Sequence, residues 1–490
     1  MQMYKSCKML QAYKNTSFIR FFFLVLTTLA LQTGCSQLRS HDELMSPVIA
    51  ARNNQGVNVA LNQLREALSK SEQNELLYAL ELGELLRENE EYEASTQVWL
   101  HANELVLEWE KTALSTPHKL LAYLGASTIS ERLKPYEGQD YEKTWLTTRI
   151  ALNHIALGDW EAARVDIKRT HEREAIIANF RREELSQVRR EARNNGWSLR
   201  GGDLSGYPVE YIDAPEVLQL LNSYQNAFSH YLAGYLYEVL NEPSLAAPGY
   251  RKAIELKPDL FILEEGLRGL EERLRNTHQR HINETDVLFI VESGDAPVRR
   301  PFEASLPVPI RDGSGNTVFV YVSVAFPIIR PVRVPDSGHI ELGEHFLTTD
   351  PIVDLNAMAR RALRDEMPGL IFRGFSRAAS KGALQYYANT EGNEWVGLLA
   401  SIFSVTTEQA DDRLWRTLPG AVSIARGYIP PGNYPLVVNG VNTGKTIDIQ
   451  GQYAVVPIRL TGRQILVGRT ASYGQLPQRP PAKTEDAEDK

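Results

Sequence analysis

Few groups of residues in this 490-residue sequence have types and spacings that suit catalysis or ligand binding. Residues 439–446 contain Gly444, Lys445 and Thr446 in the order of a phosphate-binding loop. That loop needs glycine five residues before its Gly-Lys pair, where this chain has Asn439, and it must join a strand to a helix. Here it lies between two expected short strands, so the sequence predicts no nucleotide site.

The remaining polar clusters are equally poor candidates for chemistry. His339, Glu341, Glu344 and His345 lie close together, but their spacing matches no helical zinc pair. Residues 411–412 are both aspartate, and Arg413 follows them, which predicts local ion pairing rather than a cation site. No Gly-x-Ser-x-Gly elbow occurs. We therefore predict no catalytic residue, no cofactor and no metal, and we expect that the protein is not an enzyme.

Composition limits the class of protein further. The chain has 53 basic and 61 acidic residues, a formal charge of −8 and a pI near 5.8, which argues against nucleic-acid binding through a basic surface. A hydrophobic fraction of 43% supports a globular core, while a mean hydropathy of −0.30 excludes a polytopic membrane protein. Two cysteines cannot build a disulfide framework.

The N-terminus has the order of an export signal. Residues 1–20 carry basic residues and no acidic one, and residues 21–31 form an apolar run shorter than the roughly 20 residues of a spanning helix. Gly34 and Cys35 then resemble a bacterial lipobox, although Gln32 stands where leucine is usual. The resemblance implies cleavage after Gly34 and acylation of Cys35 with fatty acids such as palmitate. The alternative is an uncleaved anchor with an incidental cysteine.

The lipobox resemblance also implies a location. Ser36 follows the cysteine, and in the enterobacterial sorting pattern an aspartate at that place retains a lipoprotein at the inner membrane. We therefore expect residues 1–34 to be a signal peptide and residues 35–59 to be a linker. The mature protein is expected on the inner leaflet of the outer membrane, facing the periplasm.

Between residues 60 and 280 three segments share one spacing of small and aromatic residues. Such spacing resembles the tetratricopeptide repeat (TPR), in which a small residue of the first helix faces an aromatic or aliphatic residue of the second. Each helix pair buries its apolar face only by stacking on its neighbours, so these residues are expected to pack rather than to react. The repeat positions are Gly83, Tyr92, Trp99, Ala102, Trp160, Ala163, Gly234, Ala246, Tyr250, Ala253 and Pro258.

From residue 285 the hydrophobic pattern changes to that of strands. Residues 287–291 and 318–324 are apolar or alternating, and further short strands are expected between 421 and 469. A helical insertion is predicted over 354–408, and residues 474–490 are expected to be a disordered tail. The fold class is therefore α+β, with an all-α TPR-like solenoid over 60–280 followed by a β-rich C-terminal domain over 285–470.

Within the helical insertion one face is basic. Arg373, Arg377 and Lys381 recur at intervals of four, so they line one side of a helix that Pro368 is expected to break or kink. These residues are candidates for contact with anionic lipid or an acidic partner. The alternative is that the helix packs on the sheet and its basic residues point to water.

Three stretches resemble a family of Gram-negative envelope lipoproteins with tetratricopeptide-like N-terminal halves. They are residues 136–143, residues 156–164 and residues 407–419, and the resemblance covers nearly the whole mature chain. It implies an envelope location and association with lipoproteins that activate peptidoglycan synthases. It implies no catalytic residues.

Two functions follow from these observations. The favoured one is a membrane-anchored periplasmic scaffold or adaptor that binds an envelope protein or peptide through the solenoid, in cell-envelope or peptidoglycan biogenesis. The other is an envelope hydrolase or glycan-binding protein that uses loops of the C-terminal domain. Neither involves nucleic acid or a nucleotide.

Overall fold

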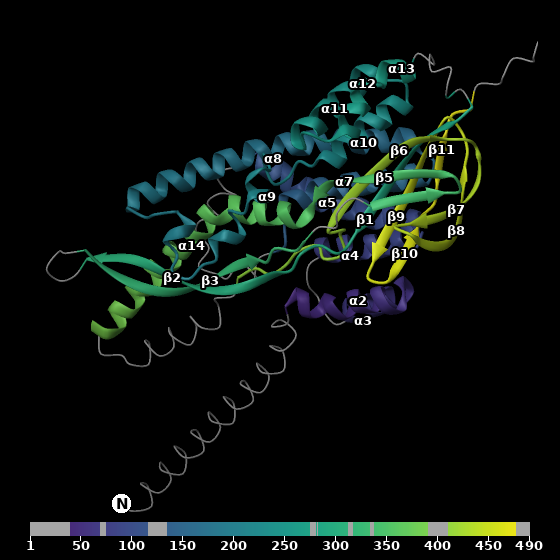
Figure 1. The fold of residues 1–490 in the computed structure, drawn as a ribbon. Coiled ribbons are helices and arrows are strands. Elements are labelled where there is room, and N and C mark those ends of the chain that lie inside the picture. Colours follow the sequence, from purple (N-terminus) through teal and green to yellow (C-terminus); the bar gives the residue numbers. More distant parts are fainter. Residues whose placement is uncertain are drawn as a thin grey trace, which may run out of the picture.

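The computed structural model describes residues 40–68, 75–115, 135–274, 281, 283–311, 317–333, 338–390 and 410–476. Helices fill the N-terminal half and strands most of the C-terminal part, which confirms the predicted α+β order (Figure 1). Gly34, Cys35, residues 391–408 of the helical insertion and the tail from residue 477 lie outside the described residues.

Helices make up most of the described residues of the N-terminal half. Their bounds are α2 His41–Gln55, α3 Val57–Leu68, α4 Glu75–Glu88, α5 Tyr92–Ser115, α7 Asp140–Ala156, α8 Trp160–Asn195, α9 Pro215–Leu218, α10 Ala227–Val239, α11 Pro243–Leu256, α12 Phe261–Arg268 and α13 Leu270–Leu274. Two short 3-10 helices, η2 Gly201–Asp203 and η3 Val209–Tyr211, interrupt the loop after α8.

The linker predicted over 35–59 is wrong for most of its described part, because α2 occupies residues 41–55. Ser40 caps this helix: its hydroxyl accepts from the Glu43 N–H (3.0 Å), and Glu43 accepts from the Ser40 N–H (3.2 Å). The helix buries Met45 and Val48 against α3 and its neighbours. The Ser-x-x-Glu spacing is a helix start signal in the sequence, and the helix continues through Pro47.

Three antiparallel helix pairs, α4–α5, α7–α8 and α10–α11, stack along the chain. In the first pair a Cβ placed on Gly83 would lie 2.2 Å from the Trp99 ring, and in the third a Cβ placed on Gly234 would lie 2.7 Å from the Tyr250 ring. Each glycine therefore admits the aromatic side chain of its partner helix. The aromatic ring in turn fixes how closely the two helices approach.

The other repeat positions are also part of the core. Ala102, Ala163, Ala246 and Ala253 are fully buried, whereas Pro258 follows the end of α11 and is exposed. The two aromatic residues that begin α5 and α8 reach the end of the C-terminal domain. The Tyr92 hydroxyl accepts from the Arg469 N–H (2.9 Å), and the Trp160 ring lies 5.3 Å from the Tyr473 ring.

Among the described residues the C-terminal domain forms a nine-stranded sheet and a separate two-stranded one. The larger sheet has the order β10-β9-β1-β6-β5-β4-β7-β8, with β11 also paired to β9; only β1 and β9 are parallel. Its strands are β1 Thr285–Ser293, β4 Gly338–Leu342, β5 His345–Asp354, β6 Ala421–Ile429, β7 Gly432–Val438, β8 Val441–Ile449, β9 Tyr453–Thr461, β10 Gln464–Val467 and β11 Ala471–Tyr473.

The large sheet curls, so that its end strands β8 and β10 approach each other and one face becomes an interior (Figure 1). Strand β1 is buried on both faces: Val287 and Phe289 join the interior of the curl, while Leu288 and Ile290 pack with the helices. One hydrophobic core thus runs from α4 through α10 into the outer face of the sheet. The helices and the sheet are therefore one folded body.

The second sheet is a hairpin of β2 Arg299–Arg311 and β3 Thr317–Ile329, which pairs over 13 positions. It packs against α14 Leu355–Thr390, and both extend from the body on the side where the C-terminal part of α8 lies (Figure 1). Helix α14 continues through Pro368, so of the two expectations the break is wrong, and the kink stays a prediction. Beyond this proline, Phe372 and Phe375 pack on Trp197 from the loop after α8, which holds the helix in place.

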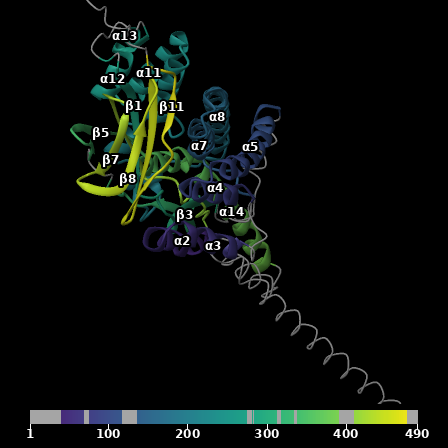
Figure 2. The same ribbon diagram turned by 90° about the vertical axis from the view of Figure 1, so that its right-hand side faces the viewer.

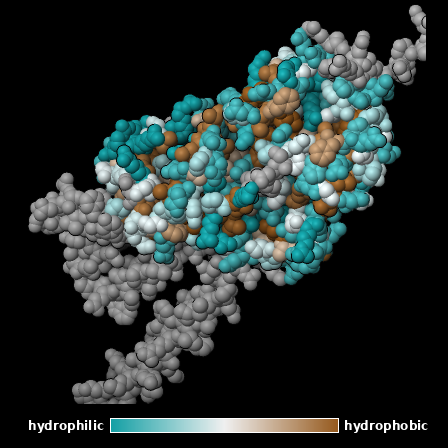
Figure 3. Space-filling view, viewed as in Figure 1, coloured by the Kyte–Doolittle hydropathy of each residue, from teal (hydrophilic) through white to brown (hydrophobic). Residues whose placement is uncertain are grey.

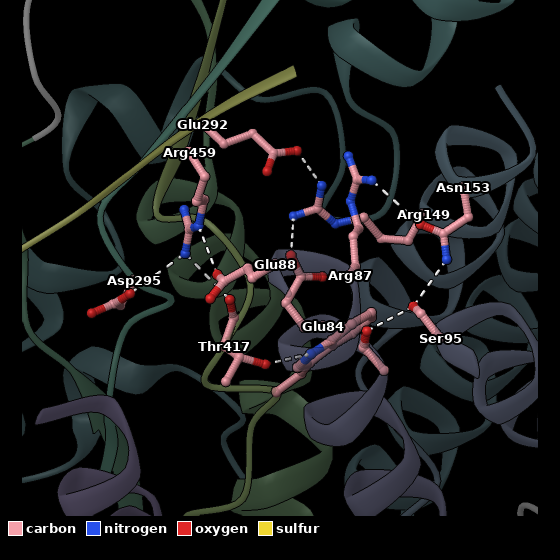
Figure 4. A network of polar contacts seen from close by, with 12 residues as sticks. Glu84, Arg87, Glu88, Ser95, Arg149, Asn153, Glu292, Asp295, Thr417 and Arg459 are labelled. Atoms are coloured by element: carbon pink, nitrogen blue, oxygen red, sulfur yellow. Dashed lines mark hydrogen bonds and ion pairs between the residues drawn. The ribbon is translucent and has the colours of Figure 1, made fainter. Parts of the chain in front are cut away.

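Buried ion pairs also join the helices to the sheet (Figure 4). Arg149 of α7 donates to Glu84 of α4 (2.8 Å) and to Glu292 of β1. Glu88 of α4 accepts from Arg459 of β9 (3.1 Å). Figure 2 shows the layers that these contacts connect, with the sheet on one side of the stacked helices. Within the described residues no helix is both long enough and apolar enough to cross a bilayer.

Candidate functional site

The face of the helix pairs that points toward the sheet is covered by the protein's own chain. The Trp415 N–H donates to Oε1 of Glu142 on α7 (2.7 Å). One carboxylate on α4, that of Glu81, accepts from the N–H groups of Arg416 (2.7 Å) and Thr417 (2.9 Å). Carboxylates of two successive helix pairs thus hold the backbone of one extended segment.

Side chains of this segment fill the space between the helices and the sheet. Trp415 is fully buried and meets Trp99 of α5 edge-on, with ring centroids 5.9 Å apart. Leu414 and Leu418 on either side are also buried. The sequence predicts that the solenoid binds an external partner but does not specify the surface. In the described residues the sheet-facing surface holds residues 414–418, so a binding site must be sought elsewhere.

Burial affects the acid that anchors this segment. It raises the pKa of Glu142, and the hydrogen bonds from the Trp415 N–H, the Tyr136 hydroxyl and the Gln139 N–H partly offset that effect. Both carboxyl oxygens of Glu142 are used within the protein. The group is therefore a structural clamp and has no oxygen left for a ligand.

A cleft of about 440 Å³ opens between α8 and α14. Its size falls in the range of sites that hold small molecules or a few residues of a peptide. The α8 wall consists of Phe180, Arg181, Arg182, Glu184, Leu185, Val188 and Arg189. The α14 wall consists of Ala362, Arg364, Asp365, Glu366, Pro368, Gly369 and Arg373. Residues 135–140, Ser223, Tyr224, Arg299, Asp411 and Arg413 complete it.

Helical spacing explains why these side chains share the cleft. On α8, Arg182, Leu185 and Arg189 recur at intervals of three and four, which places them on one side of the helix. Glu183 and Arg190 fall on the opposite side and do not line the cleft. The exposed surface of α8 therefore has two different sides.

Ion pairs fix four of the seven arginines in the cleft. Arg181 binds Asp140 through two hydrogen bonds (2.6 and 3.0 Å). Arg413 binds Asp411 through two more (2.7 and 2.8 Å), as the sequence predicts for this neighbouring pair. The other two pairs are Arg299–Glu366 (3.0 Å) and Arg364–Asp213 (2.8 Å).

Two arginines at the α8 rim have a different environment. Arg182 and Arg189 are exposed, and the structure gives neither an ion pair with a described carboxylate. Arg182 donates only to the side-chain oxygen of Asn179 (3.3 Å) among described groups. The net positive charge of the cleft, seven arginines against six carboxylates, is therefore concentrated on this rim.

The buried lysine Lys143 lies next to the cleft and stabilises the carboxylate of Asp140. The Lys143 ammonium lies 3.6 Å from the centroid of the Trp109 ring and 3.4 Å from Asp140. Burial lowers the pKa of Lys143 despite the neighbouring carboxylate of Asp140. Burial alone would raise the pKa of Asp140, but Arg181 and Lys143 together lower it. Asp140 is thus held as a carboxylate at the start of α7.

The residues predicted for interaction fall only partly in this cleft. Arg373 lines it, and its guanidinium lies close to Gly369. Arg377 is half-buried one turn further along α14 and does not line it. The side chain of Lys381 lies outside the described residues. Arg182 and Arg189 were missed because a run of mixed charges on a long helix is typical of a solvated surface.

The other motifs lie in hairpins. Asn439 and Gly440 form the two-residue turn between β7 and β8, both with positive φ, as a tight hairpin of this kind requires. His339 lies on β4 and stacks on Phe346, while His345 begins β5 and meets Tyr434. No group of three or more described His, Cys, Asp or Glu side chains is placed to hold a metal ion.

The surface around these features is mixed. On the face shown in Figure 3, hydrophobic residues lie in small areas separated by hydrophilic ones. The cleft between α8 and α14 is therefore identified by its concave shape and its arginines, and not by a hydrophobic patch.

Comparison with known proteins adds little to this picture. No family model and no curated protein matches the chain. A crystal structure of a tetratricopeptide repeat protein from Parabacteroides merdae is similar to it over 49% of this chain and all of that one, at 14% identity and a TM-score of 0.14. At that TM-score the two folds cannot be equated, so the likeness to a repeat protein is weak.

Proposed function

We propose that this protein is a lipid-anchored adaptor of the bacterial envelope that binds a segment of a partner protein in the cleft between α8 and α14. The observation that carries the proposal is the cleft itself. It is formed by two helices from distant parts of the chain, and its α8 rim carries arginines that no described carboxylate neutralises. Such a preformed concave surface suits binding rather than packing.

In this proposal the N-terminal half is a TPR-like array that serves as a frame. The glycine–aromatic contacts of α4–α5 and α10–α11 support that description. Its sheet-facing surface holds residues 414–418, so the partner binds in the cleft between α8 and α14 instead. The alternative of a hydrolase or glycan-binding protein acting through C-terminal loops gains no support from a cleft whose two main walls are helices.

Anchoring by Cys35 on the inner leaflet of the outer membrane is part of the proposal, supported by the order of basic residues, apolar run and Gly34-Cys35. Several acyl chains give firm attachment, since each buried methylene contributes about 0.8 kcal/mol. Cys35→Ala should leave a larger precursor that no longer takes up labelled palmitate. Undiminished labelling of that variant would contradict the lipid anchor.

The binding face can be tested in cells with a photo-crosslinking amino acid. Placed at Arg189, which lines the cleft, it should form a discrete crosslink to an envelope protein. Placed at the adjacent Arg190, on the opposite side of the same helix, it should not. Equal crosslinking at both positions, or none at Arg189, would argue against the cleft as the binding face.

A further inference from the structure

The chemistry of the cleft indicates what kind of segment it binds. Arg182 and Arg189 lie two helical turns apart on α8, and Leu185 and Val188 lie between them on the same wall. A ligand that follows this wall meets a basic group, then an apolar area, then a second basic group. Arginine binds carboxylates through paired hydrogen bonds, with more geometric specificity than a lysine ammonium provides.

The opposite wall has a different character. Arg373 lies there beside Pro368 and Gly369, while Asp365 and Glu366 balance the charge of the α14 wall, so the unbalanced positive charge is that of the α8 rim. The protein as a whole is acidic, with a formal charge of −8. A basic rim on an acidic protein attracts negative ligands locally and repels them elsewhere.

Charge alone fits a phosphate-rich membrane surface as well as a peptide, but the shape of the site favours a peptide. Six carboxylates lie among the cleft arginines, and four arginines are already paired within the protein. A flat anionic surface would reach the rim but not Leu185, Val188 or Phe180 inside. A peptide chain with spaced carboxylates is narrow enough to contact both the rim arginines and the apolar side chains.

We propose that the cleft binds an extended acidic peptide segment of a partner protein, with carboxylates on Arg182 and Arg189 and an apolar side chain against Leu185 and Val188. This proposal rests on the adaptor function above and specifies the chemistry of the segment bound. It requires no group other than those of the cleft and the peptide.

The test is a binding titration with the full chain purified in detergent. The probe is a fluorescein-labelled peptide with the sequence Glu-Ser-Leu-Ser-Glu, in which an extended backbone puts both carboxylates and the leucine on the same side. Its binding is followed by fluorescence anisotropy. The same peptide with glutamine or with lysine in place of glutamate serves as comparison. We expect binding of the glutamate peptide alone, and weaker binding as the salt concentration rises.

Two double variants of α8 assign the binding to the cleft. Arg182→Glu with Arg189→Glu should weaken binding of the glutamate peptide by about tenfold or more, since two charge-assisted contacts become repulsive. Lys168→Glu with Arg190→Glu changes the net charge equally, but neither residue lines the cleft, so this variant should change affinity less than about twofold. Circular dichroism of both variants checks that the fold is retained.

Three results would overturn the proposal. They are equal affinity for the glutamine peptide, equal loss in both double variants, and absence of peptide binding together with capture of anionic phosphatidylglycerol vesicles that depends on Arg182 and Arg189. A crosslink at Arg189 to a partner without acidic segments would leave the adaptor function standing and reject only the acidic peptide. The two proposals can thus fail separately.

Discussion

At the scale of single residues, the most unusual feature is a set of carboxylates buried between the helices and the sheet. Glu84 and Glu292 share the guanidinium of Arg149, and all three side chains are buried. Burial raises the pKa of Glu84 to about 7, and the attraction of Arg149 only partly opposes it. At Glu292 burial has the same tendency, but Arg149, Arg87 and Arg459 together lower the pKa.

The raised pKa of Glu84 predicts a specific pH dependence of stability. An unfolded glutamate titrates near pH 4.5, so between about pH 4.5 and 7 the folded protein holds a proton that the unfolded chain lacks. The stabilisation from this proton is complete below pH 4.5 and is lost as the pH rises through 7. For a group so deeply buried the loss is at most about 3 kcal/mol.

Glu84→Gln removes this titration while the amide oxygen can still accept from Arg149. The free energy of unfolding of the variant should therefore fall less between pH 5 and pH 8 than that of the wild-type protein. Urea denaturation at several pH values measures it. Parallel curves for the two proteins would show that Glu84 is charged throughout this range.

At the scale of elements, the helix pairs depend on glycines that face aromatic rings. Gly83→Ala places a methyl group where the Trp99 ring lies, at 2.2 Å, and the ring has little room to move because it is fully buried. Overpacking of this kind costs about 1–3 kcal/mol. We expect a lower thermal midpoint for this variant.

Gly202→Ala is a suitable control, because a Cβ at this exposed position meets no atom within 4 Å. The midpoint of the control should stay close to that of the wild-type protein. If both variants melt like the wild-type protein, Gly83 and Trp99 do not set the distance between α4 and α5.

Sequence patterns predicted the helices and strands better than they predicted the candidate site. The start of β1 at Thr285 and the order of helices before strands follow from hydrophobic periodicity, which depends only on neighbouring residues. Helix α2 was missed because Pro47, which usually breaks helices, lies inside the helix that Ser40 and Glu43 begin. The cleft has no local pattern, because α8 and α14 are far apart in the sequence and meet only in the fold.

At the scale of the whole molecule, the helices and strands are held together by a segment that no repeat pattern reveals. Residues 414–418 are clamped by Glu81 and Glu142 and buried against Trp99. The two halves predicted as separate domains therefore share one core. This arrangement predicts that they unfold together.

Trp415→Ala should lower stability by about 3–5 kcal/mol, the cost of removing a large buried aromatic side chain. Differential scanning calorimetry should show one transition for the wild-type protein and one transition at lower temperature for the variant. Leu114→Ala, at a position 61% exposed, should leave the transition nearly unchanged. Two transitions in the wild-type protein, with only the second affected by Trp415→Ala, would mean that the halves are independent.

The central claim about this protein is that residues 414–418 cover the sheet-facing side of the helices, whereas the cleft between α8 and α14 is open to a partner. Hydrogen–deuterium exchange of the full chain in detergent, with and without the glutamate–leucine peptide, tests it most directly. We predict slower exchange on peptide addition in residues 180–190 of α8 and 362–373 of α14, and no change in α4 or in residues 414–418. Protection confined to α4 and residues 414–418 would contradict the claim and place the binding site on the sheet-facing side of the helices.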